Sequence, residues 1–117
     1  MIEATLCLLT QGDPATGVLL GYKKAGFGSG KYTGFGGKVE VGETPVEAAA
    51  RELVEETGIW VPPENLRRVG DLTFIFPAKP SWSQRVHVFL ATSWEGEPAE
   101  SREMAPACFA VDAIPFD

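Results

Sequence analysis

The chain is short, acidic and of ordinary hydrophobicity. Its 117 residues are 44% hydrophobic and 22% charged, which is typical of a globular protein and predicts a single domain over residues 1–117. The formal net charge of −6 argues against general affinity for duplex nucleic acid. No apolar run approaches the length of a membrane-spanning helix. We therefore expect neither a nucleic acid nor a membrane as a partner.

The two cysteines bear on the compartment. Cys7 and Cys108 lack the spacing of a metal site, and both lie in strand-like runs. We expect two buried free thiols in a reducing compartment, with a disulfide as the alternative. The first residues do not form a charged-then-apolar signal segment. Together these features favour the cytoplasm.

The N-terminal segment predicts an antiparallel hairpin with strands at 3–10 and 17–23. Turn-forming residues separate the two runs. Alternation along the first strand places Thr5 and Cys7 on the same face. A glycine-rich loop follows, but it does not fit a P-loop, because Ala25 stands where an earlier glycine is required and Tyr32 follows Lys31.

Lysines gather immediately before the most acidic part of the chain. Lys23, Lys24, Lys31 and Lys38 fall in a stretch that contains no acid between residues 21 and 39. A lysine-bearing loop beside carboxylates suits a polyphosphate that is bridged by metal ions. Ordinary solubilising lysines are the alternative, above all for Lys24 and Lys31.

A helix with well-marked ends is predicted over residues 45–57. Thr44 is expected to cap it, with Pro45 at the first position and Glu47 completing a capping box. Gly58 supplies the stop, because glycine enters a left-handed conformation at little cost. Apolar residues recur at i, i+3, i+4 and i+7 and make one face for the core.

The neighbouring face of this helix carries an unusual cluster of charge. Arg51, Glu52, Glu55 and Glu56 fan across one surface at 100° per residue. Like charges at i, i+3 and i, i+4 each cost a few tenths of a kcal/mol in an isolated helix, and the helix dipole disfavours acids near the C-terminus. A bound divalent cation would turn this repulsion into ligation, and oxygen ligands favour magnesium or manganese. A solvated acidic face, partly neutralised by Arg51, is the alternative.

The rest of the chain predicts strands at 66–76, 84–94 and 107–111. In the second of these, alternation places Val86, Val88 and Leu90 on one face and His87 on the other. A strand histidine without a metal-spaced partner is more often structural than catalytic, so we expect a structural role for His87. Residues 95–106 read as a polar connection.

The helix and its loop resemble a known family. Gly37, Glu43 and the run Arg51-Glu52-Leu53-x-Glu55-Glu56-x-Gly58-Ile59 match every defined position of a Nudix box. The stretches 23–39, 86–89, 100–104 and 114–116 are similar to the MutT-type branch of that family. The resemblance implies an α/β fold in which a mixed, mainly antiparallel sheet packs against the box helix.

The resemblance also implies a metal site and a reaction. Mg²⁺, or Mn²⁺, would be held by the Gly36 carbonyl with Glu52, Glu55, Glu56 and Glu103. Glu56 is the first candidate for the general base, ahead of Glu55 and Glu103. Arg51 would orient the carboxylates through i, i+4 contact with Glu55.

For the substrate, the resemblance implies a nucleoside triphosphate that is cleaved to monophosphate and pyrophosphate. Oxidised purine nucleotides such as 8-oxo-dGTP are the expected class. Mammalian members of the branch carry an asparagine where this chain has Thr33, which offers one hydroxyl instead of an amide. The expected substrate-binding residues are Thr5, Lys23, Phe27, Thr33, Phe35, Gly37 and Lys38. Another nucleoside-diphosphate-linked substrate, or a nucleotide-binding module without turnover, remains open.

In the family a C-terminal helix follows the element matched by residues 114–116 and covers one face of the sheet. This sequence does not supply that helix. An open apolar sheet face would be a liability in a monomer. We therefore expect association with a partner or with a second copy of the chain through this face; a truncated sequence or a pared-down pocket is the alternative.

Overall fold

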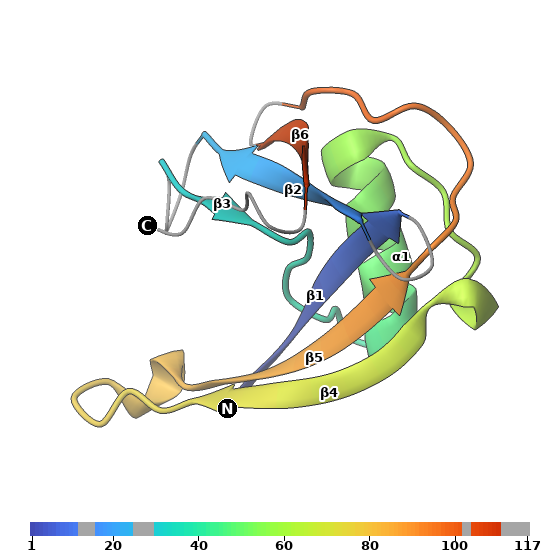
Figure 1. Cartoon of the computed structure of the whole chain (residues 1–117). Helices are drawn as coiled ribbons and strands as arrows, with labels where there is room; N and C mark the ends of the chain where they lie inside the picture. Colours follow the sequence, from blue (N-terminus) through green and yellow to red (C-terminus); the bar gives the residue numbers. More distant parts are fainter. Residues whose placement is uncertain (12–15, 25–29, 102–103, 111–117) are drawn as a thin grey trace.

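The computed structural model describes residues 1–11, 16–24, 30–101 and 104–110. Across these residues the fold consists of one α-helix, two short 3₁₀ turns and a six-stranded sheet (Figure 1). The strands are β1 (Ile2–Gln11), β2 (Gly17–Lys23), β3 (Tyr32–Thr33), β4 (Arg67–Phe74), β5 (Gln84–Ala91) and β6 (Met104–Ala110). The helix is α1 (Pro45–Thr57), and the 3₁₀ turns are Pro63–Asn65 and Pro80–Trp82.

The sheet has the order β3-β2-β1-β5-β4, and β6 pairs with β2 outside this path. β1 and β5 run parallel, while the other strand pairs are antiparallel. The predicted α/β class, with a mixed and mainly antiparallel sheet packed against the helix, is confirmed.

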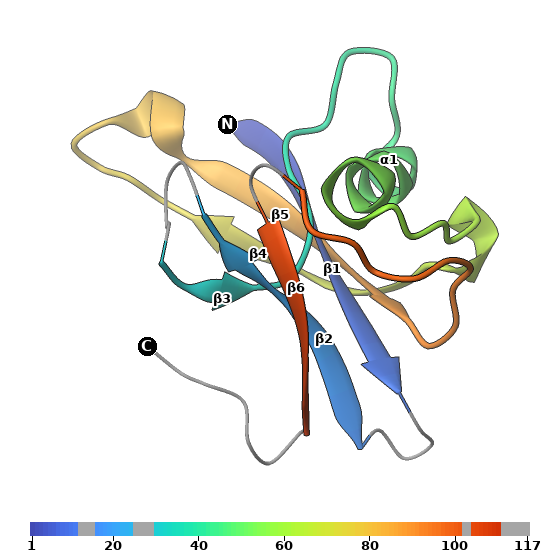
Figure 2. The same ribbon diagram turned by 90° about the horizontal axis from the view of Figure 1, so that it is seen from above.

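Strands β1 and β2 meet at one end only. Their register covers Leu9–Gln11 of β1, and beyond it the two strands diverge (Figure 2). Residues 35–38 enter the opening and bridge to β1 through the pairs Cys7–Phe35 and Ala4–Lys38. The divergence separates the sheet into two parts, β2–β3–β6 and β1–β5–β4, with a gap that this segment partly fills.

Helix α1 begins and ends where its caps predict. The Thr44 hydroxyl accepts a hydrogen bond from the Glu47 amide at 3.3 Å, and the Glu47 carboxylate accepts one from the Thr44 amide at 2.9 Å. Gly58 ends the helix at φ 76°, in the left-handed region. The capping box alone satisfies two of the amide groups that an α-helix leaves open at its N-terminus.

The core lies between α1 and the sheet. The helix contributes Ala49, Ala50 and Leu53, which pack with residues from β1, β2 and β5. The buried cluster comprises Cys7, Leu9, Leu19, Phe35, Ala49, Ala50, Leu53, Ile59, Val61, Leu66, Phe89 and Ala91. Within the described ranges no helix is both long and apolar enough to cross a membrane.

Several predictions about the C-terminal strands are wrong. β6 begins at Met104 rather than at residue 107, and Pro106 lies inside it. Because the described residues pair β6 with β2 alone, its other edge has no ladder partner, and a proline is tolerated on such a strand. Cys108 is exposed rather than buried, since β6 lies at the rim of the sheet. β4 and β5 also end earlier than predicted, at Phe74 and Ala91.

Candidate functional site

Arg51 gathers four carboxylates around one guanidinium. Its Nε and NH2 donate to the two oxygens of Glu43 at 2.8 and 3.1 Å, which is a bidentate pairing. Its NH1 donates to Glu52 at 2.9 Å and to Glu55 at 3.1 Å, and Glu40 lies 3.6 Å away. The expected i, i+4 contact with Glu55 is present. Arg51 thus fixes the carboxylates of the helix with respect to the loop before it.

The same guanidinium holds the loop backbone. Its NH2 donates to the Lys38 carbonyl at 3.1 Å. These bonds and charges hold the pKa of Glu43 below its usual range, with the Arg51 hydrogen bond as the largest cause. The pKa of Arg51 is raised in turn, chiefly by its hydrogen bond to Glu43. Both groups therefore stay charged at neutral pH.

Glu56 lies on the inner side of the helix face and reaches the same loop. Its side chain is 7% exposed, and its Oε1 accepts a hydrogen bond from the Gly36 amide at 2.9 Å. A buried carboxylate that is held by a backbone amide is fixed in place. It lies one helical turn from Glu52, as the i, i+4 spacing requires.

The carboxylates offer the hard oxygen donors that a magnesium-type cation prefers. Gly37 allows Glu52 to approach closely, since a Cβ at Gly37 would stand 2.6 Å from the Glu52 Oε1. However, the described residues contain no group of three or more His, Cys, Asp or Glu side chains arranged to hold a metal ion. Glu52 and Glu55 turn towards Arg51 instead. The donor chemistry fits a divalent cation, while the predicted ligand set of Glu52, Glu55, Glu56 and Gly36 stays a prediction.

Two predicted site residues lie outside the described part of the chain. They are Phe27, expected at the substrate, and Glu103, expected at the metal.

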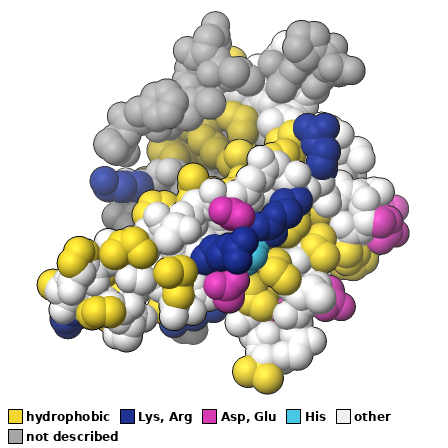
Figure 3. Space-filling model, turned by 90° about the horizontal axis from the view of Figure 1, so that it is seen from below, with side chains coloured by type: hydrophobic (Ala, Val, Ile, Leu, Met, Phe, Trp, Pro, Cys, Tyr) yellow, Lys and Arg dark blue, Asp and Glu magenta, His cyan; other side chains and the backbone are white. Residues whose placement is uncertain are grey.

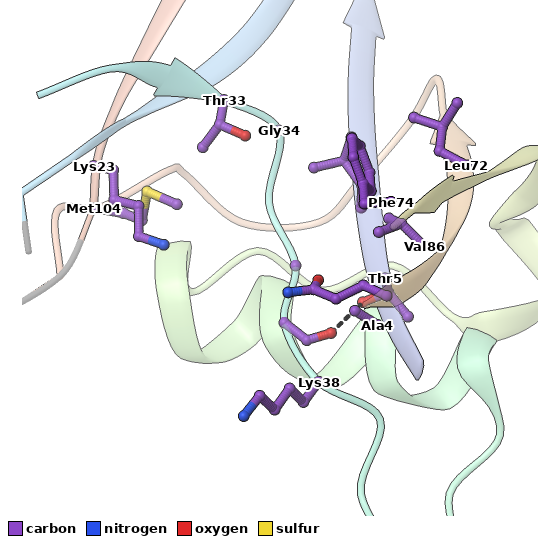
Figure 4. Close-up of a pocket in the computed structure, with 14 residues that line it drawn as sticks. Ala4, Thr5, Lys23, Thr33, Gly34, Lys38, Leu72, Phe74, Val86 and Met104 are labelled. Carbon is purple, nitrogen blue, oxygen red and sulfur yellow. Dashed lines mark hydrogen bonds between the residues drawn. The ribbon is translucent and has the colours of Figure 1, made fainter. Parts of the chain in front are cut away.

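A cavity of about 320 Å³ opens where β1 and β2 diverge. Figure 4 shows its two walls facing each other, one from β2, β3 and β6 and the other from β4 and β5. The lining residues are Ala4, Thr5, Leu6, Lys23, Thr33, Gly34, Gly36, Gly37, Lys38, Leu72, Phe74, Gln84, Val86 and Met104. Five of the expected substrate-binding residues are in this lining, namely Thr5, Lys23, Thr33, Gly37 and Lys38.

The segment 36–38 forms the floor that joins this cavity to the helix. The Thr5 amide donates to the Gly37 carbonyl at 2.8 Å, and the Thr5 hydroxyl contacts the same carbonyl at 3.4 Å. A Cβ at Gly36 would stand 1.9 Å from the Thr5 carbonyl oxygen, so only glycine fits there. The carboxylate cluster and the cavity thus both adjoin the same short loop.

Phe35 was expected to line the base pocket, but it is not among the residues that line the cavity. Its side chain is fully buried in the hydrophobic core and does not reach the cavity. Successive side chains of an extended segment point to opposite sides, so Gly34 and Gly36 face the cavity while Phe35 points towards the helix.

The sequence interpretation missed much of the cavity wall. Leu72 and Phe74 from β4, Gln84 and Val86 from β5, and Met104 from β6 all line it. A partial signal exists, because alternation places the members of each pair on a common face. The sequence does not indicate that β1 and β2 separate, and that separation is what turns this face into a wall.

His87 is not part of the cavity lining and belongs to a network of charged side chains, where Figure 3 shows the histidine among arginines and acids. Its Nδ1 lies 2.6 Å from the Arg68 NH1 and its Nε2 lies 2.8 Å from the Glu3 Oε1. Since a guanidinium only donates, Nδ1 accepts and Nε2 carries the proton. Asp71 continues the network through Arg68 and Arg85, at 3.0 and 3.2 Å. These bonds agree with the structural role that the sequence suggested.

Comparisons with known proteins agree with this architecture. Curated relatives named oxidized purine nucleoside triphosphate hydrolase, from Danio rerio and Mus musculus, are 52% and 50% identical over 99 residues. Each alignment covers 85% of this chain and 62% of the relative, so the chain spans less than two thirds of their length. A crystal structure of a MutT NUDIX hydrolase from Burkholderia pseudomallei superposes with a TM-score of 0.85 at 27% identity, covering 99% of this chain and 88% of that one. Residues 2–116 match the NUDIX domain model, and the chain therefore belongs to the NUDIX domain family.

Proposed function

We propose that this protein hydrolyses nucleoside triphosphates to the monophosphate and pyrophosphate, and that oxidised purine nucleotides such as 8-oxo-dGTP are its substrates. The observation that carries the proposal is the juxtaposition at segment 36–38, where the carboxylates of α1 adjoin the cavity floor. The two curated relatives at 50–52% identity support the substrate class. The function would be to remove damaged nucleotides from the nucleotide pool.

In this mechanism the cavity holds the base and sugar, and the phosphates lie over the loop. Lys23 and Lys38 line the cavity and supply positive charge for the phosphate oxygens. The backbone at Gly36 and Gly37 carries no side chain that would keep the phosphates away. Arg51 keeps Glu52 and Glu55 oriented beside them.

Water attacks the anhydride between the α- and β-phosphates, and one proton must leave the water. Glu56, held by the Gly36 amide, is the first candidate to accept this proton, and Glu55 or Glu103 is the next. We propose Mg²⁺, or Mn²⁺, as the cofactor, held by Glu52, Glu55, Glu56, the Gly36 carbonyl and Glu103. When bound, such an ion offsets phosphate charge and lowers the pKa of a water molecule.

The test is a screen for Mg²⁺-dependent pyrophosphate release from normal and oxidised nucleoside triphosphates and from nucleoside-diphosphate-linked compounds. We expect the oxidised purine triphosphates to be turned over fastest. Turnover restricted to diphosphate-linked compounds would instead support a different NUDIX substrate. Tight nucleotide binding without any turnover would support a nucleotide-binding module.

We further propose self-association through the apolar residues that the β4–β5 hairpin leaves exposed, and a cytoplasmic location. The exposed residues that do not line the cavity, called here the hairpin surface, are Val69, Ile75 and Trp82, with exposed fractions of 49 to 60%. An exposed cluster of this kind supports an interaction surface. The free thiols of Cys7 and Cys108 support a reducing compartment.

A further inference from the structure

One wall of the cavity is apolar except for a single neutral amide. β4 and β5 contribute Leu72, Phe74 and Val86, and Gln84 stands opposite Phe74 at the start of β5. The other neutral polar groups of the lining are the Thr5 and Thr33 hydroxyls. A few placed polar groups within an apolar lining are what fix the orientation of a ligand in such a pocket.

The backbone of Gln84 is held from both sides. Gln84 pairs with Ile2 of β1 in the parallel ladder and with Phe74 of β4 in the antiparallel one. Directly opposed residues on an antiparallel pair share a face, with Cβ atoms about 5 Å apart. The amide therefore stands beside the Phe74 ring, so that a base stacked on the ring would direct an edge towards Gln84.

The Gln84 amide is also available to a ligand. Its side chain is only partly buried, and it makes no hydrogen bond to any residue that the structure describes. Its neighbours on the wall, Phe74 and Val86, have no polar side-chain atoms. A glutamine amide presents one acceptor and two donors, whereas Thr33 presents a single hydroxyl.

We propose that Gln84 is a specificity-determining residue, which pairs bidentately with a purine edge that places a hydrogen-bond donor next to an acceptor. The inference rests on the proposed function, because it takes the cavity as the base site. The same pairing geometry joins glutamine to adenine, through the N6 donor and the N7 acceptor.

Oxidation of guanine creates such an edge. Guanine itself presents two adjacent acceptors, N7 and O6, so an amide satisfies only one of them. In 8-oxoguanine N7 carries a hydrogen, and the edge becomes a donor flanked by carbonyl acceptors. Gln84 would then accept from N7–H and donate to a neighbouring carbonyl. The amide would therefore bind the oxidised base more tightly than the normal one.

The test is binding of the monophosphate products, which needs no turnover. Calorimetry compares 8-oxo-dGMP, dAMP and dGMP on the full chain, on Gln84→Leu and on Gln11→Leu. Gln11 is a matched control because it is exposed at the end of β1, away from the cavity lining. We expect Gln84→Leu to weaken the binding of 8-oxo-dGMP and dAMP about tenfold to a hundredfold. The affinity for dGMP should change about threefold or less. Gln11→Leu should leave the affinities for all three monophosphates unchanged.

Kinetics on the triphosphates gives an independent readout. Gln84→Leu should raise KM for 8-oxo-dGTP by a similar factor with kcat nearly unchanged, since the lost contact is made equally in the ground and transition states. Equal weakening of all three monophosphates, or no weakening, would overturn the role of Gln84. A wild-type chain that discriminates between the monophosphates but hydrolyses no triphosphate would instead overturn the proposed function.

Discussion

The Glu56 carboxylate accepts a hydrogen bond from the Gly36 amide at 2.9 Å, and this one contact joins the last turn of the helix to the floor of the cavity. In the proposed mechanism it has a chemical use, because a carboxylate held at a fixed place beside the phosphates suits a general base. It also has a structural use, since it satisfies a polar group on a segment that enters the sheet.

Replacement of Glu56 by glutamine separates these two uses. A glutamine oxygen still accepts from the Gly36 amide, so Glu56→Gln should fold, while a neutral amide takes no proton. We expect pyrophosphate release to fall about 10²- to 10⁴-fold. Glu64→Gln, on the exposed 3₁₀ turn, is the matched control and should keep full activity. Retention of more than about a tenth of the wild-type turnover by Glu56→Gln would remove it as the base.

Gly36 should be far less replaceable than Gly70. Alanine at Gly36 places a Cβ 1.9 Å from the Thr5 carbonyl oxygen, whereas at Gly70 no atom lies within 4 Å. We expect Gly36→Ala to lower the free energy of unfolding by about 3 kcal/mol or to prevent folding, as overpacking does at rigid backbone. Gly70→Ala should change it by about 0.5 kcal/mol or less. Urea unfolding of both variants makes the comparison, and similar midpoints would contradict it.

Glu43 should contribute stability that depends on pH. Its pKa is lowered in the folded state by Arg51, so its contribution is present above the unfolded pKa of about 4.3 and is lost as the pH falls through the lower folded value. The difference in unfolding free energy between wild type and Glu43→Gln should therefore be largest near neutral pH and shrink in acid. Glu97→Gln, at an exposed position, serves as the control. A difference that stays constant from pH 7 to pH 3 would rule out the linkage.

The two thiols should react at very different rates. Cys108 is exposed, whereas burial raises the pKa of Cys7 to about 12 and leaves no thiolate at neutral pH. One equivalent of a disulfide reagent such as dithionitrobenzoate should react quickly with the native protein, and the second only on unfolding. Cys108→Ser should abolish the fast phase. Two fast equivalents in the native protein would show that Cys7 is accessible.

The hairpin surface should drive self-association. Ile75 is 60% exposed and does not line the cavity, so Ile75→Lys charges this surface and spares the site. Sedimentation equilibrium should show a concentration-dependent increase in mass for the wild type, reduced in Ile75→Lys. Val41→Lys, at a fully exposed position in the loop before the helix, is the control. A monodisperse wild-type monomer at high concentration would refute the proposal.

The sequence predicted local features well and tertiary ones poorly. The ends of α1 follow from Thr44, Glu47 and Gly58, whose effects act within one helical turn. The structure has both the capping box and the glycine at the C-terminal end. The contact between Arg51 and Glu55 follows from helical spacing in the same way.

The cavity wall depends on how strands that are distant in the sequence pair with one another. Local sequence patterns do not specify this pairing. Gln84 and Phe74 become neighbours only through the β4–β5 register. The resemblance predicts Phe35 in the pocket, but the alternation of its extended segment directs its side chain into the core. The exposure of Cys108 likewise depends on the position of β6 at the rim of the sheet.

The divergence of β1 and β2 has a consequence for how such a protein can change. The carboxylates lie on α1, while the apolar wall of the cavity lies on β4 and β5, and the short loop at 36–38 adjoins both the carboxylates and the cavity. Under the proposed function, the reacting groups and the apolar wall of the base site are thus encoded in separate stretches of chain. Under the same proposal, exchange of the β4–β5 hairpin for that of another family member should change the ligand preference and leave the carboxylate cluster on α1 unaltered.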